Sequence, residues 1–98
     1  MTHPAPTARD ENDRIRTGGH FGPDTDTPLM ITPGVKALGD DAIARLYIQC
    51  MEFDAFDPDE SPDHDFGVLD AFGTSVWFKI DRTPDGGRVV TFLLPEEY

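Results

Sequence analysis

His64 lies between two carboxylates, Asp63 and Asp65, and such a group could hold a metal ion or move a proton. The other two histidines, His3 and His20, lie far away in segments with weak structural signals, so no ligand spacing joins them to His64. A single histidine in an acidic loop usually does no more than bind its own proton more tightly. We therefore expect neither a metal nor a cofactor. An enzyme or metal-binding module built on His64 is the alternative hypothesis.

Other sequence patterns that carry chemistry are missing. The stretch that starts at Asp57 has Pro62 at its sixth position, where a calcium-binding EF-hand loop needs glycine. Cys50 is the single cysteine, and it falls on the apolar face of a predicted helix, which favours a buried structural thiol over a nucleophile. No glycine-rich phosphate loop follows a predicted strand. We therefore predict that the protein is not an enzyme.

Acidic side chains are concentrated in residues 46–78, which hold eight Asp and Glu residues and no Lys or Arg. The whole chain has 98 residues and a formal charge of −11, so this third carries most of the imbalance. Pro58 and Pro62 keep its middle out of a helix and stiffen it. We interpret the tract as a preformed anionic ridge, with a solvated loop as the alternative. The predicted partner-binding residues are Glu52, Asp54, Asp57, Asp59, Glu60, Asp63, Asp65 and Asp70.

This charge balance excludes several classes of partner. Direct nucleic-acid binding depends on Lys and Arg at phosphates, which an isoelectric point near 4.3 does not supply. An anionic membrane surface would repel the chain, and no apolar run approaches the ~18 residues of a membrane-spanning helix. With no signal peptide in view, we expect a cytoplasmic protein. We also expect a monomer, because two copies of the ridge would repel each other.

Hydrophobic periodicity predicts an α+β domain. We expect a flexible tail over residues 1–10 and a single domain over 11–98, with a short helix near 9–16. The main amphipathic helix is predicted over 40–53, where Ile43, Leu46 and Cys50 share one face. Alternating residues predict strands over 67–72, 76–81 and 88–94, with turns at 73–74 and 83–87. The expected fold is an antiparallel sheet of three strands, or four with residues 29–32, covered on one face by the main helix.

Several strings in the chain resemble a small bacterial domain family of unknown function that recurs on plasmids, prophages and other mobile elements. They are Asn12-Asp13-Arg14-Ile15-Arg16, His64-Asp65-Phe66-Gly67, Trp77-Phe78-Lys79-Ile80-Asp81 and the C-terminal Glu96-Glu97-Tyr98. The resemblance covers about residues 12–98 and names no reaction. It implies a genomic setting in which small proteins disarm host defence.

Size, acidity and that setting together also resemble small acidic anti-CRISPR inhibitors of type I systems. The resemblance implies that the protein binds the Cascade surveillance complex, mimics DNA charge and occupies the basic nucleic-acid channel. An effector of this kind must hold nucleic acid in a positively charged groove. The alternative is another mobile-element interaction protein, such as an antitoxin or a decoy of a basic DNA-binding protein.

Overall fold

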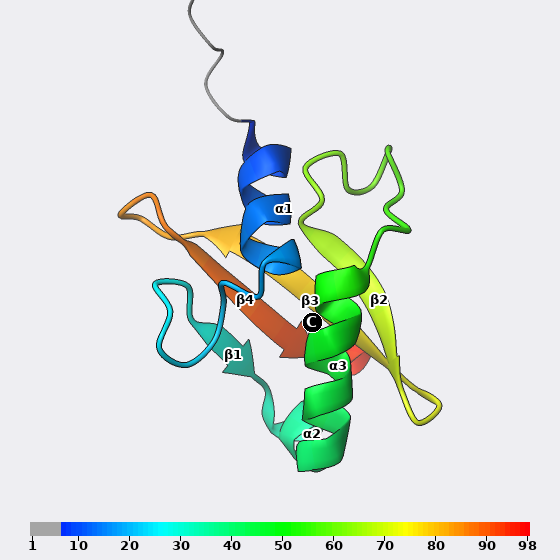
Figure 1. The fold of residues 1–98 in the computed structure, drawn as a ribbon. Helices are drawn as coiled ribbons and strands as arrows, with labels where there is room; N and C mark the ends of the chain where they lie inside the picture. Colours follow the sequence, from blue (N-terminus) through cyan, green and yellow to red (C-terminus); the bar gives the residue numbers. More distant parts are fainter. Residues whose placement is uncertain (1–6) are drawn as a thin grey trace, which may run out of the picture.

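A computed structural model describes residues 7–98 as a four-stranded sheet with its two longest helices side by side on one face (Figure 1). The strand order across the sheet is β1-β4-β3-β2. The strands are β1 (Leu29–Ile31), β2 (Phe66–Ala71), β3 (Thr74–Arg82) and β4 (Arg88–Leu93). The helices are α1 (Ala8–Thr17), α2 (Pro33–Lys36), α3 (Asp40–Glu52) and the 3₁₀ helix η1 (Pro95–Glu97). The predicted α+β class and the main helix on the sheet are confirmed.

The sheet is mixed, because its fourth strand runs parallel to its neighbour. β2, β3 and β4 pair antiparallel, as predicted, whereas β1 pairs parallel with β4, so that Met30 lies beside Thr91. A parallel pair needs a long crossover between its strands. Here α2, α3 and the β2–β3 hairpin supply that crossover, and the local pattern of residues 29–32 gave no sign of the direction.

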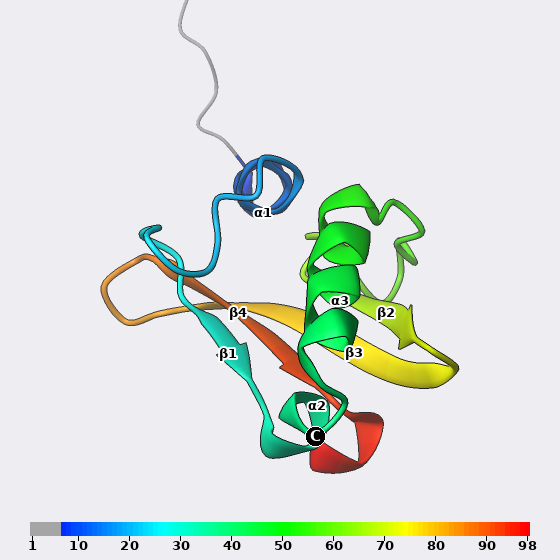
Figure 2. The same ribbon diagram turned by 60° about the horizontal axis from the view of Figure 1, so that its bottom comes forward.

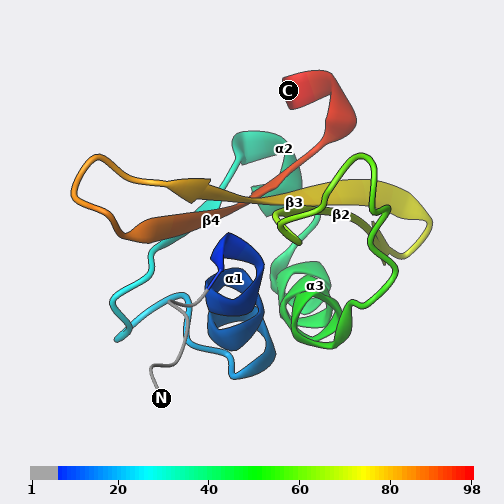
Figure 3. The ribbon, with the colours of Figure 1, turned by 90° about the horizontal axis from the view of Figure 1, so that it is seen from above.

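The core lies between the sheet and the pair α1 and α3 (Figure 3). Leu46 and Cys50 of α3 are fully buried against alternate residues of β3 and β4, including Phe78 and Phe92. With the bottom of the molecule turned forward, α2 and η1 are seen to close one end of the sheet (Figure 2). Val35 of α2 is also fully buried. The spacing of three and four residues that predicted one apolar helix face therefore marks the face that meets the sheet.

Most predicted boundaries differ from the structure by one or two residues, and two of these differences have a clear physical reason. Helix α1 begins at Ala8, with Thr7 as its N-terminal cap, so the last residues assigned to the tail are helical, and residues 1–6 lie outside the described part. Burial of Ile15 and Arg16 holds this polar helix in place, a tertiary effect that its sequence does not show. Phe72 belongs to the turn and not to the strand before it, since Ala71 already pairs with Thr74.

The hairpin between β3 and β4 follows the predicted turn chemistry. The backbone N–H of Gly86 donates to the carbonyl of Thr83, and Gly86 has a φ of 88° that glycine adopts without strain. In residues 7–98, no helix is both long and apolar enough to cross a bilayer.

Candidate acidic interaction site

The predicted acidic residues gather around the acidic loop, defined here as residues 53–65, which joins α3 to β2. Seven of the eight are exposed, and Asp65 is half-buried. Five of the exposed ones, Glu52 and the four loop residues Asp54, Asp59, Glu60 and Asp63, accept no hydrogen bond on their carboxylates within the described part of the chain. Glu52 ends α3 where the loop begins, whereas Asp70 lies near the far end of β2, beside the turn to β3. The structure therefore brings seven of the eight predicted residues to one end of the molecule.

Hydrogen bonds inside the acidic loop give it a defined shape. The hydroxyl of Ser61, only 1% exposed, accepts from the backbone N–H of Asp65 at 3.0 Å and of Phe66 at 3.1 Å. It donates in turn to the Asp65 carboxylate at 3.0 Å. The Asp57 carboxylate accepts from the backbone N–H of Asp59 at 2.8 Å. Asp57 and Asp65 thus hold the loop together, in addition to any contact with a partner.

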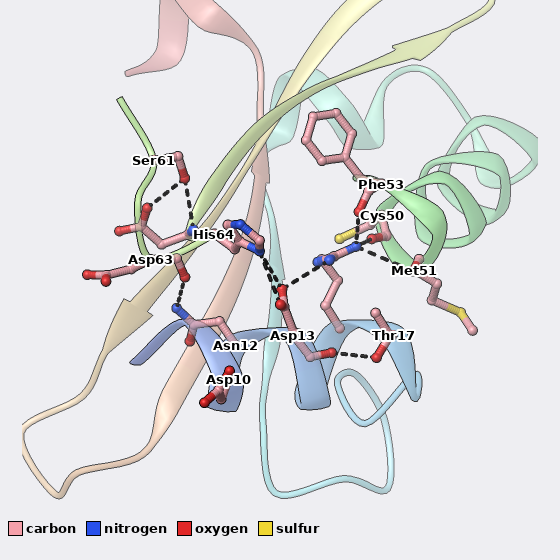
Figure 4. Close-up of polar contacts among 12 residues, drawn as sticks. Asp10, Asn12, Asp13, Thr17, Cys50, Met51, Phe53, Ser61, Asp63 and His64 are labelled. Atoms are coloured by element: carbon pink, nitrogen blue, oxygen red, sulfur yellow. Dashed lines mark hydrogen bonds and ion pairs between the residues drawn. The ribbon is translucent and has the colours of Figure 1, made fainter. Parts of the chain in front are cut away.

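Arg16 of α1 fixes the start of the loop. Its guanidinium is 3% exposed and donates to the carbonyl of Cys50 at 2.8 Å and to that of Phe53, the C-cap residue directly after α3 (Figure 4). The last carbonyls of a helix lack partners within it and carry partial negative charge, which a cation satisfies. The guanidinium also lies 4.9 Å from the centre of the Phe56 ring, inside the loop. One buried cation therefore caps α3 and holds the first residues of the loop.

The end of the loop is fixed by two neighbours of Arg16 on the same helix. Asn12 donates from its side-chain amide to the carbonyl of Asp63 at 3.0 Å, and His64 Nδ1 lies 2.9 Å from Asp13 Oδ1 (Figure 4). The His64 imidazole stacks on the Phe56 ring, with centroids 4.0 Å apart. We call Asn12, Asp13 and Arg16 the α1 clamp.

The α1 clamp is itself tied to the sheet. Arg88 of β4 is 6% exposed and donates from Nε to the side-chain oxygen of Asn12 at 3.0 Å. Its Nη2 forms an ion pair with Glu11 at 2.9 Å. Asn12 thus bridges Arg88 and the loop, so the strand, the helix and the acidic loop form one continuous polar network.

The partner of His64 differs from the sequence-based hypothesis. The imidazole pairs with Asp13 of α1, whereas Asp63 contributes its backbone carbonyl to Asn12 and Asp65 binds Ser61. Among residues 7–98, no cluster of three or more His, Cys, Asp or Glu side chains could hold a metal ion. The predicted burial of Cys50 is confirmed, and that burial raises its pKa to about 12, against the opposing charge of Arg16. The Cys50 thiol is therefore a poor nucleophile at neutral pH.

Sequence reasoning missed the α1 clamp. Its residues stand within the string Asn12-Asp13-Arg14-Ile15-Arg16, which counted only toward a family resemblance. Residues 12, 13 and 16 lie on one side of a helix, so the available signal was a polar stripe on a helix with one large apolar residue. Their partners lie 34 to 51 residues away in sequence, which no local pattern reports.

Comparison with known proteins gives one family match. The model of a family described as protein of unknown function, DUF3768, matches residues 31–87, more than half of the chain. No curated protein and no solved structure matches the chain. The matched region holds α2, α3, the acidic loop, β2 and β3, whereas α1 precedes it.

Proposed function

The chain belongs to DUF3768, a family of proteins of unknown function, and we propose that it binds the basic nucleic-acid-binding surface of another protein through its acidic loop. The observation that carries this proposal is the combination of exposed carboxylates with a loop that is anchored at both ends. Carboxylates held in place lose less side-chain and backbone freedom on binding than those of a flexible tail. A solvated loop would need no such anchoring.

The arrangement of the basic residues supports the same proposal. Among the described residues, two arginines are buried, Arg16 and Arg88. Arg16 donates to carbonyls at the end of α3 and Arg88 pairs with Glu11, so neither neutralises the exposed side of the loop. The loop itself contains no Lys or Arg. Like charges gathered on one surface steer an oppositely charged partner toward it and speed association at low ionic strength.

As the specific partner we propose a type I Cascade complex, with the acidic loop in the channel that receives target DNA. The support is the resemblance to small acidic anti-CRISPR inhibitors and the basic groove that such an effector must possess. Occupation of the channel would block target DNA without any reaction, so this function requires no catalytic residue and no cofactor. A decoy of a different DNA-binding protein is the second candidate, since its interface would need the same charges.

Binding of the purified protein to a type I Cascade tests the proposal, measured with and without target DNA at about 0.05 M and about 0.5 M salt. The test variant reverses four exposed loop carboxylates that hold no internal bond, Asp54, Asp59, Glu60 and Asp63, to lysine. A matched control reverses four exposed carboxylates elsewhere, Asp24, Asp26, Asp81 and Glu96. Both variants change the net charge equally, so a larger loss in the loop variant reports the position of the charges and not their number.

We expect saturating target DNA to prevent binding and the higher salt to weaken it. The loop variant should lose at least about a hundredfold in affinity, and the control less than about tenfold. Equal losses in the two variants would remove the acidic loop from the interface and leave only net charge. No binding to Cascade would exclude the CRISPR partner and leave the decoy function, which the same two variants test on a candidate basic protein.

A further inference from the structure

A groove lies between α3 and the β2–β3 hairpin. This hairpin lies on the side of α3 away from α1 (Figure 1). It consists of two adjoining hollows of about 560 and 410 Å³ that share Gln49 and Glu52 in their walls. We call this the α3–β2 groove. Ile48, Phe72, Asp41 and Glu52 line it beside α3, whereas Val68 and Asp70 line it at the edge of β2, with side chains on the face opposite to Leu69.

The apolar walls of the groove are unusually exposed for large side chains. Ile48 is 55% exposed, Val68 50% and Phe72 66%. They account for three of the five large hydrophobic residues that the described part of the chain leaves exposed. Single exposed hydrophobic residues need no explanation, but several that line one hollow are typical of a contact surface.

Phe72 also occupies a backbone conformation that does not suit it. Its φ is 52°, and with Gly73 at 90° it forms the two-residue turn between β2 and β3. Turns with positive φ at both positions favour Asn, Asp or Gly, and other residues adopt this conformation at a cost of about 1 kcal/mol or more. The ring touches the Arg45 guanidinium, 4.8 Å from its centre, but is otherwise largely in solvent. Neither the turn nor the core requires phenylalanine here, which favours a role outside the fold.

β2 is an edge strand of the sheet, but at Asp70, where it borders the groove, its peptide groups already have partners. Gln49 of α3 donates to the carbonyl of Asp70 at 2.7 Å and accepts from its backbone N–H at 3.0 Å. One side chain thus takes both peptide groups that Asp70 would offer to an added strand. A segment beside Asp70 must therefore bind through its side chains and not by pairing with this residue.

The charges of the rim define the occupant further. Asp41, Glu52 and Asp70 surround the apolar walls, and Arg45, the one base in these walls, already contacts Phe72. An apolar side chain would enter between carboxylates that favour Lys or Arg beside it. Glu52 and Asp70 also belong to the predicted acidic surface, so the groove continues that surface.

We propose that the α3–β2 groove binds a partner segment in which a large apolar side chain is flanked by Lys or Arg. The proposal rests on the proposed function for the identity of the partner, and adds an apolar anchor to an interface otherwise made of charges. Carboxylates steer the basic partner, whereas Phe72 and Ile48, which line the same hollow, hold the bound state. The contribution of the anchor should persist at salt concentrations that screen the charges.

A titration of the full chain with synthetic peptides, in which NMR detects binding, tests the groove without any assumption about Cascade. One amphipathic peptide combines Lys and Leu, and a second replaces every Leu by Ser. The test variant is Phe72→Asn, which suits the positive φ of the turn and should keep or raise the thermal stability. The control is Met30→Thr, at an equally exposed apolar residue on the opposite edge of the sheet.

At about 0.5 M salt we expect the Lys-Leu peptide to bind at least about tenfold more tightly than the Lys-Ser peptide and to shift the amides of Ile48, Val68 and Phe72. Phe72→Asn should remove that preference, and Met30→Thr should not. Equal binding of the two peptides, or a preference that survives Phe72→Asn, would overturn the proposal.

The same variants separate this inference from the proposed function. Suppose that Cascade binds, that Phe72→Asn leaves the affinity unchanged and that reversal of the loop carboxylates abolishes binding. The groove proposal is then wrong and the acidic-loop proposal holds. If Cascade does not bind but the Lys-Leu preference depends on Phe72, the CRISPR partner is wrong and the groove stands.

Discussion

Asp13 of α1 and His64 of the acidic loop lie 51 residues apart in sequence, and His64 Nδ1 is 2.9 Å from Asp13 Oδ1. This contact links a helix outside the matched family region to a loop inside it. Arg16 and Asn12 form two more such links. The conformation of the acidic loop therefore depends on α1, although α1 itself presents none of the predicted partner-binding residues.

Replacement of Arg16 by lysine should destabilise the protein by about 2–3 kcal/mol, because one ammonium cannot reach the carbonyls of Cys50 and Phe53 and the Asp13 carboxylate together. Urea denaturation measures the change. Arg14→Lys is the control, since Arg14 is exposed on the same helix, and it should change stability by less than about 0.5 kcal/mol. Equal effects of the two substitutions would mean that Arg16 does not cap α3.

His64→Ala should loosen the acidic loop while the fold persists. The substitution removes the contact with Asp13 and the stack on Phe56, and places alanine at a φ of 55°. Amide hydrogen exchange of residues 61–66 should accelerate about tenfold, with the amides of β3 and β4 unchanged. His20→Ala, at an exposed histidine outside the loop, provides the comparison. Unchanged exchange in His64→Ala would show that the loop keeps its shape without this anchor.

Gly67→Ala should destabilise the protein by about 2–3 kcal/mol through crowding. A Cβ at Gly67 would lie 2.4 Å from Phe78 Cε1 and 2.7 Å from Phe53 Cε1, two rings with little room to move. At Gly87 an added Cβ would come no closer than 3.1 Å to the flexible Thr83 side chain, so Gly87→Ala should cost less than about 1 kcal/mol. Thermal denaturation compares the two variants, and a similar loss in both would contradict the packing argument.

Glu97→Gln should make the protein less stable at neutral pH and leave it unchanged in acid. Hydrogen bonds from the Thr32 hydroxyl and then from the backbone N–H of Leu94 lower the pKa of the Glu97 carboxyl below its ordinary 4.5. A lowered folded-state pKa gives stability that is complete above 4.5 and is lost as the pH falls through the lower value. The melting temperatures of wild type and variant should therefore differ at neutral pH and converge in acid. A difference in melting temperature that persists in acid would mean that the introduced side-chain amide, and not the lost charge, causes the destabilisation.

Local patterns were sufficient for α3 and for the antiparallel strands of the sheet. The apolar face of Leu46 and Cys50 predicted α3, and the alternation of Val76, Phe78 and Ile80 predicted β3, because each pattern repeats with the period of its backbone. The same logic failed at Phe72, where an aromatic residue continued the alternation of β2 but the chain turns. Phe72 does not pack in the core, so its hydrophobicity was a poor predictor of its backbone conformation.

For the candidate site, the sequence by itself determined the charge: eight acidic residues without a base in one third of the chain, interrupted by two prolines. Only the tertiary structure decided that α1 clamps the loop, that Asp13 and not Asp63 or Asp65 pairs with His64, and that β1 lies parallel to β4. Charge is a property of residue types and can be counted along the chain. The clamp depends on backbone carbonyls and on contacts between residues far apart in sequence. Every chain has such carbonyls, and only the folded structure determines which side chains reach them.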